Sequence, residues 1–409
     1  MKYNFDEVLN LSKSSSLKYD FAKEMGVPES ALPLWEADMD FRIPTEATEA
    51  LLNKAKHSVF GYMILDDDYR NAVLNWCSSR YGFNAKPEWI VTTPGGLCAL
   101  AMAVRSFTQE HEAILIQGPV FYYMFANIIS GNKRKIIDNS LVYKNGRYHI
   151  DLDDFERKVV ENNVKMFILC NPHNPVGRVW TKDELYEMGQ ICLRNNCLVV
   201  SDEIHCDIVY EGYKHHNFTT VHESFLENTL VITSPSKAFN LAGMQTTNVF
   251  VANEKLRIKY TAEISNSGLG SLNTMGQTAC KAVYEHGREW LSELLQYLKG
   301  NLEYMKNYFA EHFPQVKVVE PEGTYLIWLD FTALNLPQNK LDRILFDKAD
   351  VWLSSGVTFG HQGSGFQRIT IACPRKTLEA GLQRICKIKP YLGIFVFQIL
   401  CSVLGVCFL

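Results

Sequence analysis

The stretch Ser234-Pro235-Ser236-Lys237-Ala238-Phe239-Asn240-Leu241-Ala242-Gly243 follows the β-rich run 229–233 (TLVIT). It places one lysine beside two hydroxyls at the end of a predicted strand. Ser234 and Ser236 can hold an anion next to the amine of Lys237. By itself the string is also compatible with an ordinary solvated lysine, so the segments upstream decide how it is interpreted.

An amine beside anion donors is what pyridoxal phosphate requires, because its aldehyde carbon bonds an amine and its phosphate needs donors. Asp202 ends a second apolar strand within 198–205 (LVVSDEIH). In open α/β sheets, ligands bind beyond the carboxyl ends of the strands. A carboxylate there can keep the pyridine nitrogen protonated, so that the ring accepts electrons. The alternative is a solvated acid or a helix cap.

A third strand, 166–170 (MFILC), runs into the loop 171–178 (NPHNPVGR), where two Asn-Pro pairs and a glycine indicate a sharp turn. This loop is either a plain turn or a site at which Asn174 donates its amide to the phenolate oxygen of the ring.

Taken together and in order, NPHNPVGR, SDEIHCD and SPSKAFNLAG resemble the class I/II aminotransferase-type superfamily of pyridoxal phosphate enzymes. Two further segments, 35–41 (WEADMDF) and 60–62 (FGY), are similar to its cystathionine β-lyase or cysteine-S-conjugate β-lyase branch. The resemblance covers roughly residues 1–388. It implies that Lys237 carries pyridoxal 5′-phosphate as a Schiff base. The other implied contacts are Asp202 with the pyridine nitrogen, Asn174 with the phenolate oxygen and His205 close by, Ser234 and Ser236 with the phosphate, and Tyr62 with the phosphate of a neighbouring subunit.

The chain alternates predicted strands and helices without repeats, which indicates an α/β fold with a mostly parallel sheet covered by helices. One of these helices, 181–195, begins with a capping box made by Thr181 and Glu184. We expect a large cofactor-binding domain at 46–284. A smaller α+β domain is expected at 1–45 and 285–390. The predicted strands are 89–92, 113–117, 135–137, 166–170, 198–201, 230–233 and 247–252 in the large domain, and 316–319, 324–329 and 368–371 in the small one.

Three further positions are candidate contacts. Gly95 and Gly96 lie between a strand and an apolar helix, whose first amides can bind phosphate. A simple strand–helix turn is the alternative, and the resemblance favours the phosphate site. Phe121 stands where relatives place a tyrosine that stacks on the ring. Tyr122 is adjacent and could restore the hydroxyl, while core packing is an alternative for both.

Arg368 is the expected ligand of the substrate carboxylate, because a guanidinium donates two parallel hydrogen bonds. A surface ion pair is the alternative, and only its position in the motif favours the substrate. Three residues depart from the family pattern. Thr370 replaces a common asparagine, Leu11 replaces the usual arginine, and Gln245 stands where aspartate aminotransferases place a phosphate-binding arginine. The last departure favours the lyase branch.

The pair His215-His216 is interpreted as solvated rather than as a metal site, and no metal is expected. A formal charge of −4 and the lack of basic runs argue against nucleic acid as the main partner. Eleven scattered cysteines without a C-x-x-C indicate reduced thiols in a cytoplasmic enzyme. The apolar tail 391–409 is a membrane anchor, a packed segment or a scrambled reading frame, and we favour a soluble protein without membrane contact.

The function expected from these residues is carbon–sulfur β-lysis of cystathionine or cysteine S-conjugates to thiol, pyruvate and ammonia, by a homodimer with shared active sites. An aminotransferase would use the same residues. A third interpretation, from another class, is a regulatory binding protein that retains the cofactor pocket.

Overall fold

The computed structural model describes residues 2–392, and the predicted tail lies outside the described residues from 393 onward. The chain forms two compact units. The larger unit contains Arg42–Gln296, Glu320–Tyr325 and the extreme N-terminus, and the smaller contains Asn4–Phe41, Tyr297–Val319 and the chain from Leu326. Among the described residues, no helix has the length and apolar character needed to cross a membrane.

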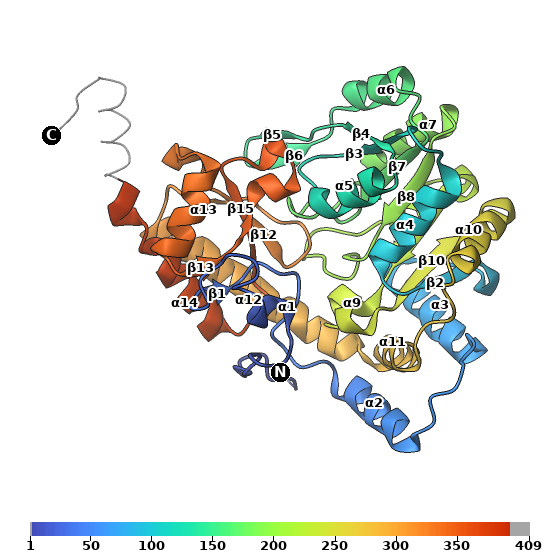
Figure 1. Ribbon diagram of the computed structural model, residues 1–409, viewed down its shortest axis with the longest axis horizontal. Coiled ribbons are helices and arrows are strands. Elements are labelled where there is room, and N and C mark those ends of the chain that lie inside the picture. The colour runs from blue at the N-terminus through green and yellow to red at the C-terminus, as the bar shows by residue number, and fades with distance from the viewer. Residues whose placement is uncertain (1, 393–409) are drawn as a thin grey trace. The chain divides into compact units, whose positions relative to one another are not determined.

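A seven-stranded sheet forms the centre of the larger unit (Figure 1). The five strands from β9 to β4 are parallel, and β10 is antiparallel to both of its neighbours. The expected α/β class with a mostly parallel sheet is therefore confirmed. The strand order is β2 (Ile90–Thr93), β10 (Thr247–Val251), β9 (Thr229–Thr233), β8 (Leu198–Asp202), β7 (Met166–Cys170), β3 (Ala113–Ile116) and β4 (Lys135–Asp138).

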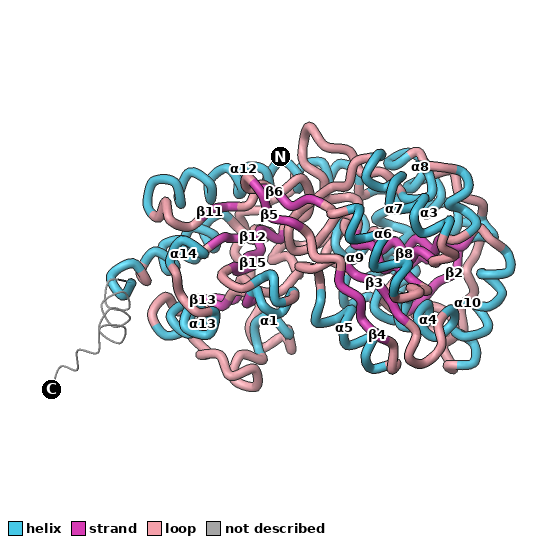
Figure 2. The backbone as a smooth tube through the Cα atoms, turned by 90° about the horizontal axis from the view of Figure 1, so that it is seen from above, coloured by secondary structure: helices cyan, strands magenta, loops and turns pink. Residues whose placement is uncertain are grey.

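Helices cover both faces of this sheet, as the view in Figure 2 shows. A sheet covered on both sides buries its strands on both faces, which explains why β3, β7, β9 and β10 are buried along their whole length. The helices of this unit are α2 (Thr45–His57), α3 (Asp67–Tyr81), α4 (Gly96–Phe107), α5 (Tyr122–Gly131), α6 (Leu152–Glu161), α7 (Lys182–Arg194), α8 (Phe218–Val221), α9 (Pro235–Ala238), α10 (Glu254–Asn266) and α11 (Thr274–His286).

Local sequence explains where several of these elements begin. The predicted capping box at α7 is present, since Glu184 N donates to Thr181 Oγ1 while the Glu184 carboxylate accepts from Thr181 N. A short hairpin, β5 (Val142–Lys144) with β6 (Arg147–His149), precedes α6. The long helix α12 (Arg288–His312) contributes its first part to the larger unit and the remainder to the smaller one.

The smaller unit has an antiparallel sheet in the order β11 (Lys317–Val318), β12 (Leu326–Asp330), β15 (Phe366–Thr370) and β14 (Ser354–Ser355). Its N-terminal segment is held by a buried ion pair between Lys18 and Asp40 at 2.8 Å and by the stacked rings of Trp35 and Trp352 at 4.4 Å. The remaining elements are β1 (Leu32–Pro33), which pairs in parallel with β13 (Val351–Trp352), and the helices α1 (Leu17–Asp20), α13 (Gln338–Asp347) and α14 (Arg375–Cys386).

Candidate active site

Three predicted site residues lie at the carboxyl edge of neighbouring parallel strands in the larger unit. Cys170 at the end of β7 is in register with Asp202 at the end of β8, which is in register with Ile232 of β9. Asp202 itself ends β8, the loop after β7 carries Asn174, and the short helix after β9 carries Lys237. The edge is where open α/β sheets bind ligands, so the topology brings together the residues that the sequence singled out.

Asp202 is a buried carboxylate, with 6% of its surface exposed. Its pKa is raised to about 7, mainly by burial and in smaller part by the charge of Glu203, while the hydrogen bond from Ile204 N and the charge of Lys237 act in the opposite direction. One of its oxygens accepts a hydrogen bond from Ile204 N at 3.3 Å. The raised pKa means that the protein by itself stabilises the ionised form of Asp202 poorly. A protonated pyridine nitrogen would supply a positive charge beside it, so the site fits the predicted cofactor.

Lys237 lies in α9, a single helical turn that begins directly after β9. Ser234 is the N-cap of this turn, since its Oγ accepts from Ser236 N at 3.1 Å and donates to Thr246 O at 2.6 Å. The two serine hydroxyl oxygens are 2.9 Å apart. Ser234 is buried and Ser236 half-buried. Ser234 thus fixes the turn and orients Ser236, which is the more accessible hydroxyl.

Asn174 and His205 are both buried, with 4% and 3% of their surfaces exposed. The backbone amide of Asn174 donates to the Sγ of Cys170 at 3.4 Å, which holds the loop after β7 against the end of its own strand. His205 meets the ring of Tyr325 edge to face, with 6.3 Å between the ring centroids. Tyr325 belongs to the 320–325 segment of the larger unit, and sequence reasoning did not single it out.

The start of α4 offers backbone donors. Gly95 is its N-cap with φ +92°, a conformation that favours glycine. The first helix-type hydrogen bond runs from Ala99 N to Gly95 O. The amides of Gly96 and the next two residues precede this bond and therefore have no acceptor within the helix. A Cβ at Gly96 would lie 3.7 Å from Ile204 Cγ2, which places this helix start beside the loop after β8.

Phe121 precedes α5 and is half-buried against the apolar core of the larger unit. Its ring meets those of Tyr123 and Phe125 edge to face. Tyr122 begins α5, but its side chain lies outside the part of the chain that the structure describes.

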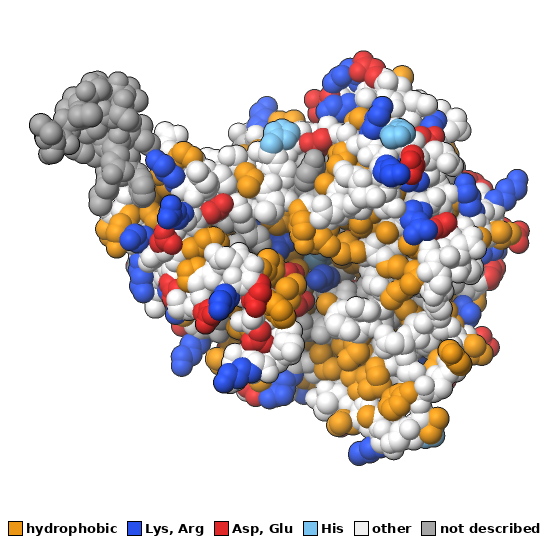
Figure 3. All heavy atoms as spheres, in the orientation of Figure 1, with side chains coloured by type: hydrophobic (Ala, Val, Ile, Leu, Met, Phe, Trp, Pro, Cys, Tyr) orange, Lys and Arg blue, Asp and Glu red, His pale blue; other side chains and the backbone are white. Residues whose placement is uncertain are grey.

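Tyr62 lies on the loop between α2 and α3, and its side chain is fully exposed. Three other large apolar residues of this loop are also exposed, namely Val59, Phe60 and Ile64. Figure 3 shows hydrophobic side chains gathered over the region where Figure 1 places α2. Exposed apolar surface of this kind is typical of interaction sites.

Arg368 belongs to β15 of the smaller unit and is 3% exposed. Its Nη2 donates to the carbonyl oxygen of Trp35 at 2.8 Å and lies 3.2 Å from Ser354 Oγ. The guanidinium carbon lies 4.8 Å from the centroid of the Phe359 ring. Arg368 is therefore buried and oriented by its own unit, so the interpretation as a surface ion pair is wrong. Thr370 is buried beyond it on the same strand.

The interpretation of His215 as a solvated loop residue is also wrong. His215 is 5% exposed, and its Nε2 lies 2.9 Å from Glu203 Oε2. The acid that binds it lies 12 residues upstream, too far away for local reasoning to find. Within the residues that the structure describes, no group of three or more His, Cys, Asp or Glu side chains could hold a metal ion. The nine cysteines of that part are free thiols.

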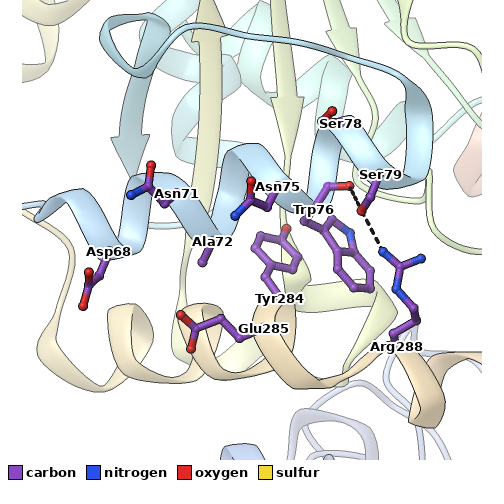
Figure 4. A pocket seen from close by; sticks show the side chains of 10 residues that line it. All are labelled: Asp68, Asn71, Ala72, Asn75, Trp76, Ser78, Ser79, Tyr284, Glu285 and Arg288. Carbon is purple, nitrogen blue, oxygen red and sulfur yellow. Dashed lines mark hydrogen bonds between the residues drawn. The ribbon is translucent and has the colours of Figure 1, made fainter.

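A surface cavity of about 530 Å³ lies between α3 and α11 (Figure 4). Polar side chains form much of its lining, and Arg288 donates to Ser79 Oγ at 2.7 Å at one end. None of the predicted site residues lines it. The cavity is therefore separate from the carboxyl edge of the sheet.

The sequence model of the family Aminotransferase class I and II matches residues 31–385, so the chain belongs to this family. It is 39% identical over 382 residues to cystathionine beta-lyase PatB of Bacillus subtilis (strain 168), which covers 93% of this chain and 98% of PatB. The structure of cystalysin from Treponema denticola, which contains pyridoxal 5′-phosphate, is 34% identical with a TM-score of 0.92. That match covers 96% of this chain and 100% of cystalysin.

A second solved structure is the PLP-bound C-S lyase from Staphylococcus hominis, which is 31% identical with a TM-score of 0.88. It covers 94% of this chain and 97% of the lyase. The predicted family and its cofactor, pyridoxal 5′-phosphate, are confirmed by these comparisons.

Proposed function

We propose that this protein is a pyridoxal phosphate-dependent carbon–sulfur β-lyase that cleaves cystathionine or cysteine S-conjugates. The observation that carries the proposal is the buried carboxylate of Asp202, which interacts electrostatically with Lys237 at the carboxyl edge of the sheet. A lysine for the cofactor's aldehyde and an acid for its ring nitrogen are the two groups that this chemistry needs. The relatives named above support the lyase branch.

We assign the remaining contacts residue by residue. Asn174 would donate its amide to the phenolate oxygen, with His205 beside it. The amides at Gly95 and Gly96, together with Ser236 held by Ser234, would bind the phosphate. Phe121 would face the ring, and Arg368 would hold the substrate carboxylate.

When bound, the cofactor supplies an electron sink that makes the Cα–H bond of the attached amino acid acidic. Lys237 Nζ would be the base that takes that proton. Asp202 would keep the ring nitrogen protonated. Cleavage of the Cβ–S bond then releases a thiol, and the reaction with one water yields pyruvate and ammonia as the other products.

The test is incubation of the purified enzyme with cystathionine, with and without a 2-oxo acid. A lyase forms thiol and pyruvate in stoichiometric amounts without the 2-oxo acid. Strict dependence on the 2-oxo acid, with no thiol release, would instead identify an aminotransferase. The variant Lys237→Ala is the matched control and should lose this activity, because both the cofactor amine and the base are removed.

The exposed apolar loop around Tyr62 supports assembly with a second copy of the chain. We assign its phenol to the phosphate of the neighbouring subunit, so that each active site is completed by the partner. The free thiols support a reducing compartment, and we place the enzyme in the cytoplasm.

A further inference from the structure

Each carboxylate oxygen of Glu203, the residue after Asp202, makes two hydrogen-bond contacts. Its side chain is 1% exposed. Oε1 accepts from Ser201 Oγ at 2.8 Å and from Phe218 N at 2.9 Å. Oε2 accepts from Asn217 Nδ2 at 3.0 Å and lies 2.9 Å from His215 Nε2. Phe218 N and Asn217 Nδ2 can only donate, one to each oxygen of Glu203, so both oxygens accept hydrogen bonds as in an ionised carboxylate, and the Ser201 hydroxyl can donate a third.

The fourth contact, with His215, depends on the tautomer of the imidazole. His215 Nδ1 is buried and has no hydrogen-bond partner among the described residues. A proton on Nδ1 would therefore be a buried, unsatisfied donor, whereas a bare lone pair at that position costs much less. The favoured state is thus the neutral ring with its proton on Nε2, donated to Glu203. The Glu203–His215 pair then carries a net negative charge.

Of the described residues close to this pair, Cys77, Cys206 and Tyr81 do not neutralise its charge. Burial raises the pKa of the thiols of Cys77 and Cys206 and of the phenol of Tyr81, so these groups stay uncharged. The guanidinium of Arg80 is engaged by Asp207, with its Nε 3.4 Å from the carboxylate.

The two groups beside His215 in the sequence do not neutralise it either. Lys214 is exposed to solvent. Burial and the charge of Lys214 lower the pKa of His216, which keeps that ring neutral.

The charge acts on Asp202, the next residue along the chain. Burial is the main reason for the raised pKa of Asp202, and Glu203 adds to it. Two adjacent buried carboxylates with Lys237 as the nearby cation leave the site with an excess of negative charge. This excess of negative charge favours the binding of a ligand whose protonated nitrogen lies next to Asp202.

We infer that Glu203, kept ionised by a neutral His215, is a positioning residue that supplies a second negative charge behind Asp202 and strengthens the hold on the protonated ring nitrogen of the cofactor. This inference rests on the proposed contact between Asp202 and that nitrogen. Glu203 touches neither cofactor nor substrate and acts through Asp202.

The experiment uses apo-enzyme reconstituted with pyridoxal phosphate labelled with ¹⁵N in the ring. The ¹⁵N chemical shift reports protonation of that nitrogen between pH 6 and 10, and a binding titration gives the cofactor Kd. For Glu203→Gln we expect the pKa of the ring nitrogen to fall by roughly one unit and Kd to rise about tenfold, the size expected for one charge at intermediate dielectric.

Two variants serve as matched controls within the same hydrogen-bond cluster. Ser201→Ala removes one hydrogen bond to Glu203 but keeps its charge. His215→Gln replaces one neutral donor by another. Both should leave the ring-nitrogen titration and Kd unchanged, even where the melting temperature falls. If Glu203→Gln also leaves both quantities unchanged, Glu203 is purely structural and the inference is overturned.

A measurement on the wild type covers the case in which Glu203→Gln does not fold. In ¹³C-histidine-labelled enzyme, the signal lost in His215→Gln should have the chemical shifts of a ring with its proton on Nε2 and none on Nδ1, under the conditions of the binding titration. A ring with protons on both nitrogens would overturn the inference, because the pair would then carry no net charge. Asp202→Asn separates the two proposals. It should abolish ring protonation, and its failure to do so would count against the proposed role of Asp202 itself.

Discussion

His173 Nε2 lies 2.9 Å from the carbonyl oxygen of Pro119, and this contact ties the loop after β7 to the loop after β3. Because a carbonyl oxygen only accepts, the imidazole must donate through Nε2–H. His173 is 1% exposed, and burial lowers its pKa to about 4. The two loops carry Asn174 and Phe121, so a neutral His173 holds both candidate cofactor contacts in place.

The folded state should therefore be less stable in mild acid. The histidine is neutral in the folded protein and protonates in the unfolded chain below its usual pKa of 6.5. Its stabilising contribution is complete above pH 6.5 and is lost as the pH falls toward 4. The difference amounts to about 3 kcal/mol at most. In His173→Gln, the free energy of unfolding from urea titrations should change less between pH 6.5 and 4 than in the wild type.

His149→Gln is the control for this measurement, because His149 is exposed on β6. It should keep the wild-type pH dependence. If His173→Gln keeps that dependence as well, His173 does not account for the loss of stability in acid.

Asp202 should destabilise the cofactor-free protein at neutral and alkaline pH. Its pKa is raised from 3.8 to about 7, so the folded state favours the protonated acid. The stabilisation that the protonated acid gives to the folded state is complete below pH 3.8 and is lost as the pH rises through about 7. In apo-enzyme at pH 8, Asp202→Asn should raise the free energy of unfolding by up to about 4 kcal/mol. At pH 4 the gain should be small.

Cofactor binding should make the wild type more stable than Asp202→Asn, because the ring nitrogen brings the missing positive charge. With pyridoxal phosphate bound, Asp202→Asn should melt below the wild type and should lose lyase turnover. Equal stability of the two apo-proteins at both pH 4 and pH 8 would show that ionised Asp202 does not destabilise the folded protein.

The sheet and its edge could be predicted because their signals are local. The residues of β7 form an unbroken apolar run, and the capping box of α7 lies within four consecutive residues. The polar residues that follow β7, β8 and β9 could be assigned to one edge because parallel strands end together. Strand order could not be predicted, and neither could the antiparallel direction of β10, since both depend on how the chain packs in three dimensions.

The buried networks behind the site were missed for the same reason. The Glu203–His215 contact spans a loop, and the sequence offers only a charged residue after Asp202 as a signal. The contact of His173 with Pro119 joins residues 54 apart. Arg368 was identified only by its motif, because the groups that hold it, Trp35 and Ser354, lie in distant segments of the chain.

The two serines before Lys237 should separate by function. Ser236→Ala should raise the cofactor Kd about tenfold, as expected for losing one hydrogen bond to a charged phosphate, with little change in stability of the apo-protein. Ser234→Ala should instead lower the free energy of unfolding by about 1–2 kcal/mol, because both an N-cap and a buried bond to Thr246 O are lost. Denaturation of apo-protein and cofactor titration measure the two effects, and equal effects of both variants on Kd would contradict this division.

Tyr62→Phe should weaken cofactor binding if the phenol reaches the phosphate of a second copy. The sharper measurement mixes Tyr62→Phe with Lys237→Ala protein under conditions of subunit exchange. Hybrids would then contain one site with both an intact lysine and an intact tyrosine, so activity should appear from two impaired parents. No recovery after exchange would mean that Tyr62 does not act across subunits.

Arg368→Lys should be far from conservative if its guanidinium binds the substrate carboxylate. An ammonium cannot donate two parallel hydrogen bonds, and losing one charge-assisted bond costs about 1.5–3 kcal/mol, or roughly a ten- to hundredfold drop in kcat/KM. The contacts to Trp35 O and the Phe359 ring orient the guanidinium, and a lysine would not keep both. The absorption spectrum of the bound cofactor should stay normal, since the residue is assigned to the substrate.

Substrate analogues separate this role from a structural one. Amino acid amides and esters lack the carboxylate, so they should be poor substrates of the wild type and lose little more in Arg368→Lys. Arg343→Lys is the control, because Arg343 is an exposed arginine of the same unit and pairs with Asp347 on α13. If Arg368→Lys instead reduces kcat/KM equally for acids and amides, the buried guanidinium serves the packing of β15 against Trp35 and Ser354, and another group must bind the carboxylate.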